Sequence, residues 1–327
     1  VYAKLIFPGP GEKDGLDHVM SVIRRVLSDG RSCRLYRQLH EEKKLVDNFT
    51  VMSEAGPREG LILVDIETDA VRLAGALVEV ARILEDLARD ACTDLELERA
   101  KTRVARSFLF GSETVQGQAG NIGHHDAMGD LAGAFRFPDR VARVSRQDVG
   151  RLAASVFRLG NANVVIYLPE DTDAAVDGVP TEPKALEDLL RPVLGDRPAA
   201  EPTPPAGPRD VSGGATRPQG QARHGAGPFR RATLAGGIEV AYRIDPTVPV
   251  FGLALTHRGG ALAETATSAG RASLAQAVQI KGTGNLDAET LHELLEGDGA
   301  VLSPQVDRDY GGMVLTGLTD RMDQALD

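Results

Sequence analysis

Aromatic residues are scarce in this sequence. Of its 327 residues only 4% are Phe, Trp or Tyr, and tryptophan is absent. Any buried core must therefore be built mainly from Leu, Val, Ile and Ala. The hydrophobic content of 42% and the charged content of 26% are ordinary for a globular protein, so such cores are expected. At ~100–200 residues per domain, the length predicts about two domains.

Basic clusters and long apolar runs are also missing. The net charge is -10, and no patch of Lys and Arg with interleaved aromatic residues occurs. This balance disfavours a nucleic-acid partner, because neutralising phosphates requires clustered cationic side chains. No run approaches the ~18 consecutive apolar residues that a transmembrane helix needs, so no membrane span is expected.

Cysteine occurs only at Cys33 and Cys92, far apart and without CxxC spacing. This excludes a disulfide framework and a zinc ribbon. Two free thiols are expected, with a single disulfide as the alternative. Because no histidine lies near Cys33 in sequence, we expect this thiol to pack inertly on a helix rather than act as a nucleophile.

The first 170 residues alternate between strand and helix patterns. Strands are predicted at 1–7, 48–54, 61–67 and 163–168, and helices at 17–28, 32–44, 71–89, 95–110, 115–128 and 145–157. Thr93 with Glu96, and Ser145 with Asp148, are predicted helix-capping pairs. This order predicts an α+β layout, in which helices cover one face of a mostly antiparallel sheet.

Composition changes between residues 171 and 228. Eight prolines and seven glycines fall between positions 192 and 228, with few large apolar side chains. Such a segment cannot bury enough surface to offset its ordering entropy, so a Pro/Gly-rich linker is predicted, with a short helix at 184–194.

An ordered pattern returns after residue 228. A hairpin turning at Gly236-Gly237 is predicted, followed by a strand at 248–256 and helices at 267–280 and 287–296. A second hairpin is predicted from strands at 301–306 and 312–318.

One stretch of this last part carries a recognisable motif. Residues 270–283 read GRASLAQAVQIKGT and resemble the frame G-L-A-H-F-L-E-H-M-L-F-K-G-T. That frame carries the inverted zinc motif H-x-x-E-H of the pitrilysin/insulinase metallopeptidases. The positions that fit the frame or come close to it are Gly270, Ala272, Leu274, Lys281, Gly282 and Thr283.

The three positions of that frame that would do the chemistry differ. Ser273 stands in place of the first zinc histidine, Gln276 in place of the glutamate base and Ala277 in place of the second histidine. A zinc hydrolase of this type needs two imidazoles one helical turn apart and a nearby base. Serine is a poor ligand, glutamine is not a base at neutral pH, and alanine has no donor atom. No catalytic, cofactor-binding or metal-binding residue is therefore predicted in this chain.

A second resemblance lies near the start. The stretch GRSCRLYRQLHEEKKLV looks like the G-R-S-S-R-L-Y-x-x-L-R-E-x-x-G-L-x-Y segment of the non-catalytic domain in each half of pitrilysin-type peptidases. LELERAK and the closing Tyr167-Leu168-Pro169 are also typical of that domain. The family uses an Arg/Tyr pair here, which reaches the zinc site of the other half and holds the substrate backbone. His40 and Asp47 occupy those two positions, so the pair is missing.

Together the resemblances imply two metallopeptidase-like α/β layer domains, the second one truncated, within a longer polypeptide. Residues 1–170 would be the second domain of one half, 171–228 the linker, and 229–327 the start of the first domain of the other half. The parent would be a zinc-dependent endopeptidase acting on peptides or unfolded proteins, with its zinc bound outside this chain. This segment would contact the other domains of the same polypeptide as chamber wall and hinge, without activity of its own. A soluble protein of the bacterial cytoplasm or periplasm is expected.

Two other interpretations stay open. The chain could be a catalytically inactive binding or scaffold subunit of a processing-peptidase-like complex, or an unrelated α+β module that matches by chance. The histidines do not favour a metal site: His124 and His125 are adjacent, and neighbours on a helix point ~100° apart. His257 and His292 are isolated in sequence, so surface or hydrogen-bonded polar positions are expected for both.

Overall fold

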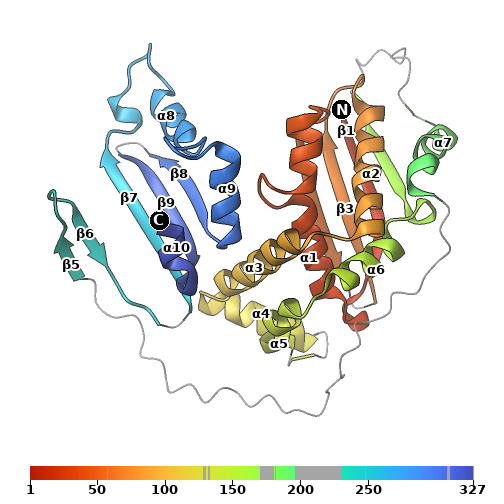
Figure 1. The fold of residues 1–327 in the computed structure, drawn as a ribbon, viewed down its shortest axis with the longest axis horizontal. Helices are drawn as coiled ribbons and strands as arrows, with labels where there is room; N and C mark the ends of the chain where they lie inside the picture. Colours follow the sequence, from red (N-terminus) through yellow and green to blue (C-terminus); the bar gives the residue numbers. More distant parts are fainter. Residues whose placement is uncertain are drawn as a thin grey trace. The chain divides into compact units, whose positions relative to one another are not determined.

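The computed structural model describes residues 1–327 except 57, 128–129, 132, 170–179, 181, 196–229, 247, 308–309 and 327 (Figure 1). Its contacts group the chain into two compact units. The first unit comprises Val1–Ala105, Arg136–Ala206 and Ala277–Gly297, and the second unit comprises Arg106–Phe135, Gly207–Gln276 and Asp298–Asp327. This grouping does not follow chain order, so the three-part division of the sequence stays a prediction. Most of the predicted linker lies outside the described residues.

The first unit is built on a four-stranded antiparallel sheet. Its strands are β1 (Tyr2–Pro10), β2 (Asn48–Ala55), β3 (Glu59–Glu67) and β4 (Asn163–Tyr167), in the order β2-β3-β1-β4. Side chains alternate along β1: Ala3, Leu5 and Phe7 are buried, whereas Tyr2 is exposed. One face of the sheet therefore carries the core, and the other is open.

β1 is longer than predicted and continues through Pro8 and Pro10. Both prolines lie opposite β3, where Pro8 faces Leu61 and Pro10 faces Glu59. On its other side, β1 pairs with β4 only from Tyr2 to Ile6. Beyond Ile6, β1 therefore has an unpaired side, where a residue without an N–H group is tolerated.

Helices cover the core face of this sheet. Figure 1 shows α1 (Asp17–Ser28), α2 (Leu73–Asp90) and α6 (Arg146–Val156) on that face, and α3 (Asp94–Gly111) follows α2 in the chain. α7 (Pro183–Leu194) lies within the predicted linker and packs against α2. Leu190 and Leu194 bring it into the core, so this part of the segment buries apolar surface.

The two capping pairs predicted from the sequence lie at the starts of α3 and α6. The Thr93 hydroxyl accepts a hydrogen bond from the Glu96 backbone N–H at 3.2 Å, and the Glu96 carboxylate accepts one from the Thr93 N–H at 2.7 Å. Ser145 and Asp148 form the same reciprocal box before α6. Each box supplies acceptors for N–H groups that the first helical turn leaves free.

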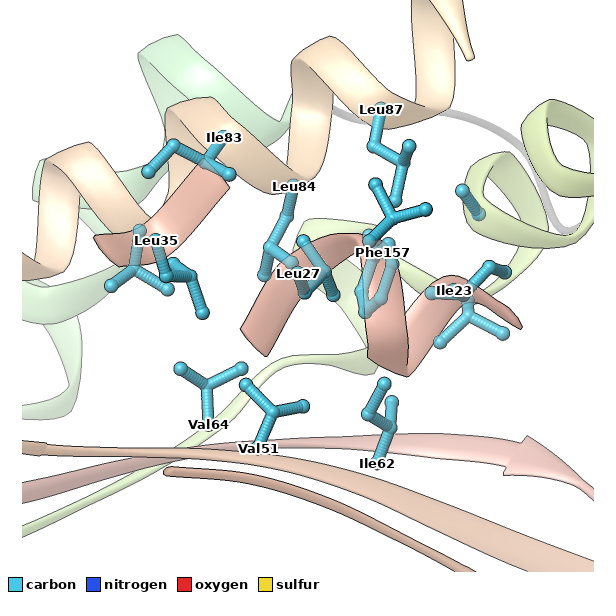
Figure 2. Packing of buried hydrophobic residues seen from close by; sticks show 14 of the residues in the cluster. Ile23, Leu27, Leu35, Val51, Ile62, Val64, Ile83, Leu84, Leu87 and Phe157 are labelled. Carbon is cyan, nitrogen blue, oxygen red and sulfur yellow. The ribbon is translucent and has the colours of Figure 1, made fainter. Parts of the chain in front are cut away.

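Figure 2 shows the core between the sheet and the helices. Val51, Ile62 and Val64 point from the strands toward Leu27 and Phe157 of the helical layer. The rings of Phe7 and Phe157 pack edge to face, with centroids 5.3 Å apart and planes at 88°. With so few aromatic residues, the remaining volume is filled by aliphatic side chains, as the composition indicated.

Two helical segments differ from the prediction. Tyr36–Glu42 form a π-helix, in which the Lys43 N–H donates to the Gln38 carbonyl at 3.2 Å, where an α-helix was predicted over 32–44. Helix α5 (Gly133–Ala142) was not predicted, because it contains Pro138, a residue of low helix propensity. Helix α4 (Val115–Ala127) precedes it, as predicted. Short 3-10 turns cover Glu12–Asp14, Leu159–Asn161, Ala261–Ala263 and Thr319–Arg321.

The second unit has a three-stranded antiparallel sheet in the order β7-β9-β8, formed by β7 (Val250–Arg258), β8 (Val301–Val306) and β9 (Tyr310–Leu318). A separate hairpin joins β5 (Arg230–Thr233) to β6 (Glu239–Tyr242). Its turn residues Gly236 and Gly237 have φ angles of 87° and 82°, a conformation that favours glycine. α8 (Arg271–Gln279) begins in this unit and α10 (Met322–Leu326) belongs to it, whereas α9 (Ala288–Gly297) belongs to the first unit. None of the helices in the described ranges is both long and apolar enough to cross a bilayer.

Candidate functional site

Helix α8 carries the three motif positions, and an acidic residue fixes its start. The Glu264 carboxylate accepts hydrogen bonds from the backbone N–H groups of Gly270 at 2.8 Å and Ala272 at 2.6 Å. These bonds lower the pKa of Glu264, because they stabilise the charged carboxylate. A negative charge at the positive end of the helix adds to this stabilisation. The helix is therefore capped by a side chain from outside it.

The side chain of Gln276, in the glutamate-base position, is turned into the second unit. It is only 5% exposed, and its Nε2 lies 2.8 Å from Nε2 of His257 on β7. The other ring nitrogen of His257 lies 3.1 Å from the Arg258 carbonyl. Both contacts are satisfied when His257 is neutral, with its proton on Nδ1, so that Nε2 accepts from the Gln276 amide.

A glycine on the neighbouring strand makes room for this pair. A Cβ atom at Gly311 of β9 would lie 3.0 Å from a ring carbon of His257 and 3.3 Å from Nε2 of Gln276. The Gln276 Oε1 is buried without a hydrogen-bond partner. The Gln276 side chain thus anchors α8 to the sheet through its NH2 group, which donates to His257. His257, predicted to be an isolated polar residue, is the partner that sequence reasoning missed.

The motif positions do not fit a zinc ion. Ser273 and Ala277 lie on the exposed side of α8, and Gln276 is committed to His257. Within the part of the chain that the structure describes, no three His, Cys, Asp or Glu side chains are grouped so that they could hold a metal. That the whole chain lacks a zinc site stays a prediction.

His40 and Asp47 are the residues predicted to replace the Arg/Tyr pair. Each of the two side chains contacts a different neighbour. The His40 ring lies beside that of Tyr36, with centroids 5.0 Å apart and planes at 32°. Both Asp47 carboxylate oxygens accept from Nη2 of Arg72 at 3.0 Å. Arg72 also donates to the Lys44 carbonyl at 3.0 Å, where Lys44 has a positive φ of 51°. Asp47 therefore helps to hold the turn that leads into β2.

Both cysteines are free and buried. Burial raises the pKa of Cys33 to about 12 and that of Cys92 to about 11. Because the thiolate is the reactive form, these environments give inert thiols. The prediction of two free cysteines is confirmed.

His124 and His125 lie on α4, and His292 lies on α9. The rings of His124 and His125 are 5.5 Å apart at 77°. His292 is half-buried, its Nε2 has no hydrogen-bond partner, and burial lowers its pKa. A neutral imidazole is the form that this environment favours.

A pocket of about 260 Å³ lies on the open face of the first unit's sheet. Tyr2 and Tyr167 are neighbours across β1 and β4, with ring centroids 6.4 Å apart. The Tyr2 hydroxyl donates to the Glu67 carboxylate at 3.1 Å. One row further along, Lys4 and Asp65 form an ion pair at 3.1 Å. Sequence reasoning did not find this pocket, because only the strand register brings these residues together.

The first part of the chain matches a known protein family. Residues 2–104 match the family model described as peptidase M16 inactive domain. The comparison with curated proteins gives no match.

Three solved structures that resemble this chain have TM-scores below 0.5. A protease from Helicobacter pylori is 20% identical, with a TM-score of 0.47, and the match covers 51% of this chain and 41% of that one. The inactive peptidase domain of a Bordetella parapertussis protein is 20% identical, with a TM-score of 0.48, over 53% of this chain and 94% of that one. The periplasmic protease PqqL from Escherichia coli is 12% identical, with a TM-score of 0.45, over 99% of this chain and 37% of that one.

This chain corresponds to less than half the length of two of these proteases. The chain spans 41% of the Helicobacter pylori protease and 37% of PqqL. The family match falls on β1, β2, β3, α1, α2 and part of α3, which include the GRSCRLYRQLHEEKKLV stretch and the part of the open-face pocket that β1, β2 and β3 line. The predicted resemblance to pitrilysin-type peptidases is confirmed there, because residues 2–104 match the family model of the peptidase M16 inactive domain.

Proposed function

We propose that this chain is the part of a zinc-dependent endopeptidase that does not bind zinc. The parent protein acts on peptides or unfolded proteins, and this chain forms wall and hinge of the chamber. The proposal rests mainly on one observation: Gln276, in the place of the catalytic base, uses its amide to fasten α8 to His257 of the sheet. A side chain held in this way serves the fold and leaves no base at that position.

The second pair of positions supports the same proposal. Asp47 is bound by Arg72 and secures a turn, so it does not replace a substrate-holding tyrosine. The family match to an inactive domain agrees with a chain that lacks its own chemistry. In this proposal the zinc ligands and the catalytic base belong to another domain of the parent.

The experiment tests metal content and activity of the purified 327-residue chain. After incubation with zinc and dialysis, metal analysis is expected to find far less than one zinc per chain. A fluorescence-quenched peptide and an unfolded protein are expected to stay intact. Stoichiometric zinc, or cleavage that a chelator abolishes, would overturn the proposal.

A scaffold subunit without any catalytic parent is the alternative. The two are separated by adding this chain in trans to a zinc-bearing half that has an intact H-x-x-E-H motif. The endopeptidase proposal expects cleavage to increase when both parts are present. A scaffold would bind the same substrates without increasing cleavage.

A further inference from the structure

The open face of the β2-β3-β1-β4 sheet is a feature that the proposed function does not use. The helices pack on the opposite face, and here the strands present their outward side chains in cross-strand rows. The first row is Asn48, Glu67, Tyr2 and Tyr167, and the second is Thr50, Asp65, Lys4 and Val165. These two rows line the 260 Å³ pocket.

The pocket exposes unusual aromatic surface for a chain so poor in aromatic residues. Tyr2 is 55% exposed and Tyr167 is 65% exposed, and their tilted rings stand next to each other at the end of the sheet. Val165 beside them is also exposed. An electron-rich ring face that is open to solvent attracts cations.

The charges of the pocket favour a cation as well. The Glu67 carboxylate accepts a hydrogen bond from the Tyr2 hydroxyl. This hydrogen bond and the negative charge of Glu67 raise the pKa of Tyr2. Asp65 is paired with Lys4, which carries the one ammonium group among the described residues that line the pocket. Two carboxylates thus face one ammonium group, and an entering anion would meet uncompensated negative charge.

The same face continues as an apolar strip. Met52 of β2 and Leu61 of β3 are both exposed and lie on it. Leu61 faces Pro8, six residues along β1 from Tyr2. At ~3.3 Å per residue, the two ends of the face are ~20 Å apart, which an extended peptide of about six residues spans.

We propose that this face binds an extended polypeptide, with a lysine or arginine side chain held between Tyr2, Tyr167 and Glu67, and apolar side chains over Met52 and Leu61. The ring faces supply cation–π attraction and Glu67 supplies a charge-assisted hydrogen bond. The proposal rests on the proposed function only in taking a polypeptide as the ligand.

The test measures binding of fluorescein-labelled peptides to the full chain by fluorescence anisotropy, without zinc. The probe is an eight-residue peptide with arginine at position 2, leucine at positions 7 and 8, and Gly and Ser between them. Replacing the arginine by citrulline keeps the shape and removes the charge. Because the proposed contacts need the charge, the citrulline peptide is expected to bind about tenfold more weakly.

Variants locate the binding on the chain. Glu67→Gln and Tyr167→Ser are each expected to weaken binding of the arginine peptide about five- to tenfold. Glu239→Gln and Tyr242→Ser make the same chemical changes on β6 of the second unit and are expected to leave binding unchanged. Circular dichroism checks that all four variants keep the fold.

Three outcomes would overturn the proposal. One is equal binding of the arginine and citrulline peptides, and another is full affinity of Glu67→Gln. The third is concentration-dependent dimerisation that Tyr167→Ser abolishes, which would show that a second copy covers the face. Because no step depends on zinc or cleavage, failure here is distinct from failure of the proposed function.

Discussion

The four-stranded sheet of the first unit and the three-stranded sheet of the second unit are covered to very different degrees. In the first unit, Leu5, Leu27 and Phe157 are completely buried between sheet and helices. In the second unit, Leu253 and Leu255 of β7 remain 47% and 60% exposed. Among the described residues, the buried cluster draws only on positions between Ala3 and Leu194.

The difference shows that an alternating strand pattern does not ensure a core. Leu253 and Leu255 lie on the same face of β7 as His257, which α8 contacts through Gln276. This contact is polar, so it fixes the helix with little apolar burial. The first unit is expected to owe its stability to hydrophobic burial, whereas the second depends more on its backbone ladder and its helix cap.

The largest contrast is expected from truncating one leucine in each unit. Leu27→Ala removes a fully buried side chain and should lower the free energy of unfolding by ~2–5 kcal/mol. Leu255→Ala removes an exposed one and should change it by less than ~0.5 kcal/mol. Urea denaturation followed by circular dichroism measures both. A similar loss in the two variants would refute the comparison.

Thiol labelling tests how well the core of the first unit protects Cys33 from solvent. With its pKa raised to about 12, Cys33 at pH 8 is a thiolate in only ~1 of 10,000 molecules, compared with about a quarter for an unperturbed thiol. Iodoacetamide should therefore modify Cys33 about a thousandfold more slowly in the folded chain than in urea. A Leu255→Cys variant supplies the matched thiol on the exposed sheet, and its new thiol should react at nearly the unfolded rate. Mass spectrometry of the labelled peptides reads out both positions, and rapid labelling of Cys33 would contradict its burial.

Substitution of Arg34 tests how much a charged hydrogen-bonded pair contributes to the stability of the first unit. Nε and Nη2 of Arg34 donate to Glu96 at 2.7 and 2.9 Å, and Nη2 also donates to the Ala91 carbonyl at 2.9 Å. Arg34→Ala leaves these acceptors partly buried and should cost ~1.5–3 kcal/mol of unfolding free energy. Arg34→Lys keeps the charge without the forked geometry and should recover only part of that loss. Equal stability of Arg34→Ala and the native chain would show that the pair is unimportant.

The smallest effect concerns the cap of the second unit. The pKa of Glu264 lies below its ordinary value of 4.5, so its stabilisation is present above that pH and is lost as the pH falls through the lowered pKa. The Glu264→Gln variant should therefore lose less stability than the native chain when the pH falls from 5 to 3. Thermal unfolding of the second unit at several pH values measures this, with Glu239→Gln as a control. Parallel pH profiles of native chain and variant would exclude the cap as the cause.

Local interactions were the predictable part of this fold. The boxes at Thr93 and Ser145 were identified because both members of each pair lie within one turn of helix. The loss of the zinc motif was visible for the same reason, since Ser273 and Ala277 are one turn apart. Helix α5 was missed because local propensity disfavours it, and Tyr36–Glu42 form wider turns than the pattern indicated.

The sequence by itself determined the family resemblance, the α+β class and the chemistry that Ser273, Gln276 and Ala277 do not provide. Only the tertiary structure decided what replaces that chemistry. Gln276 meets His257 across a helix and a strand, 19 positions apart, and Tyr2 meets Tyr167 through strand register alone. Side-chain identity is local information, whereas pairing between distant residues depends on which face each strand and helix turns toward its neighbour.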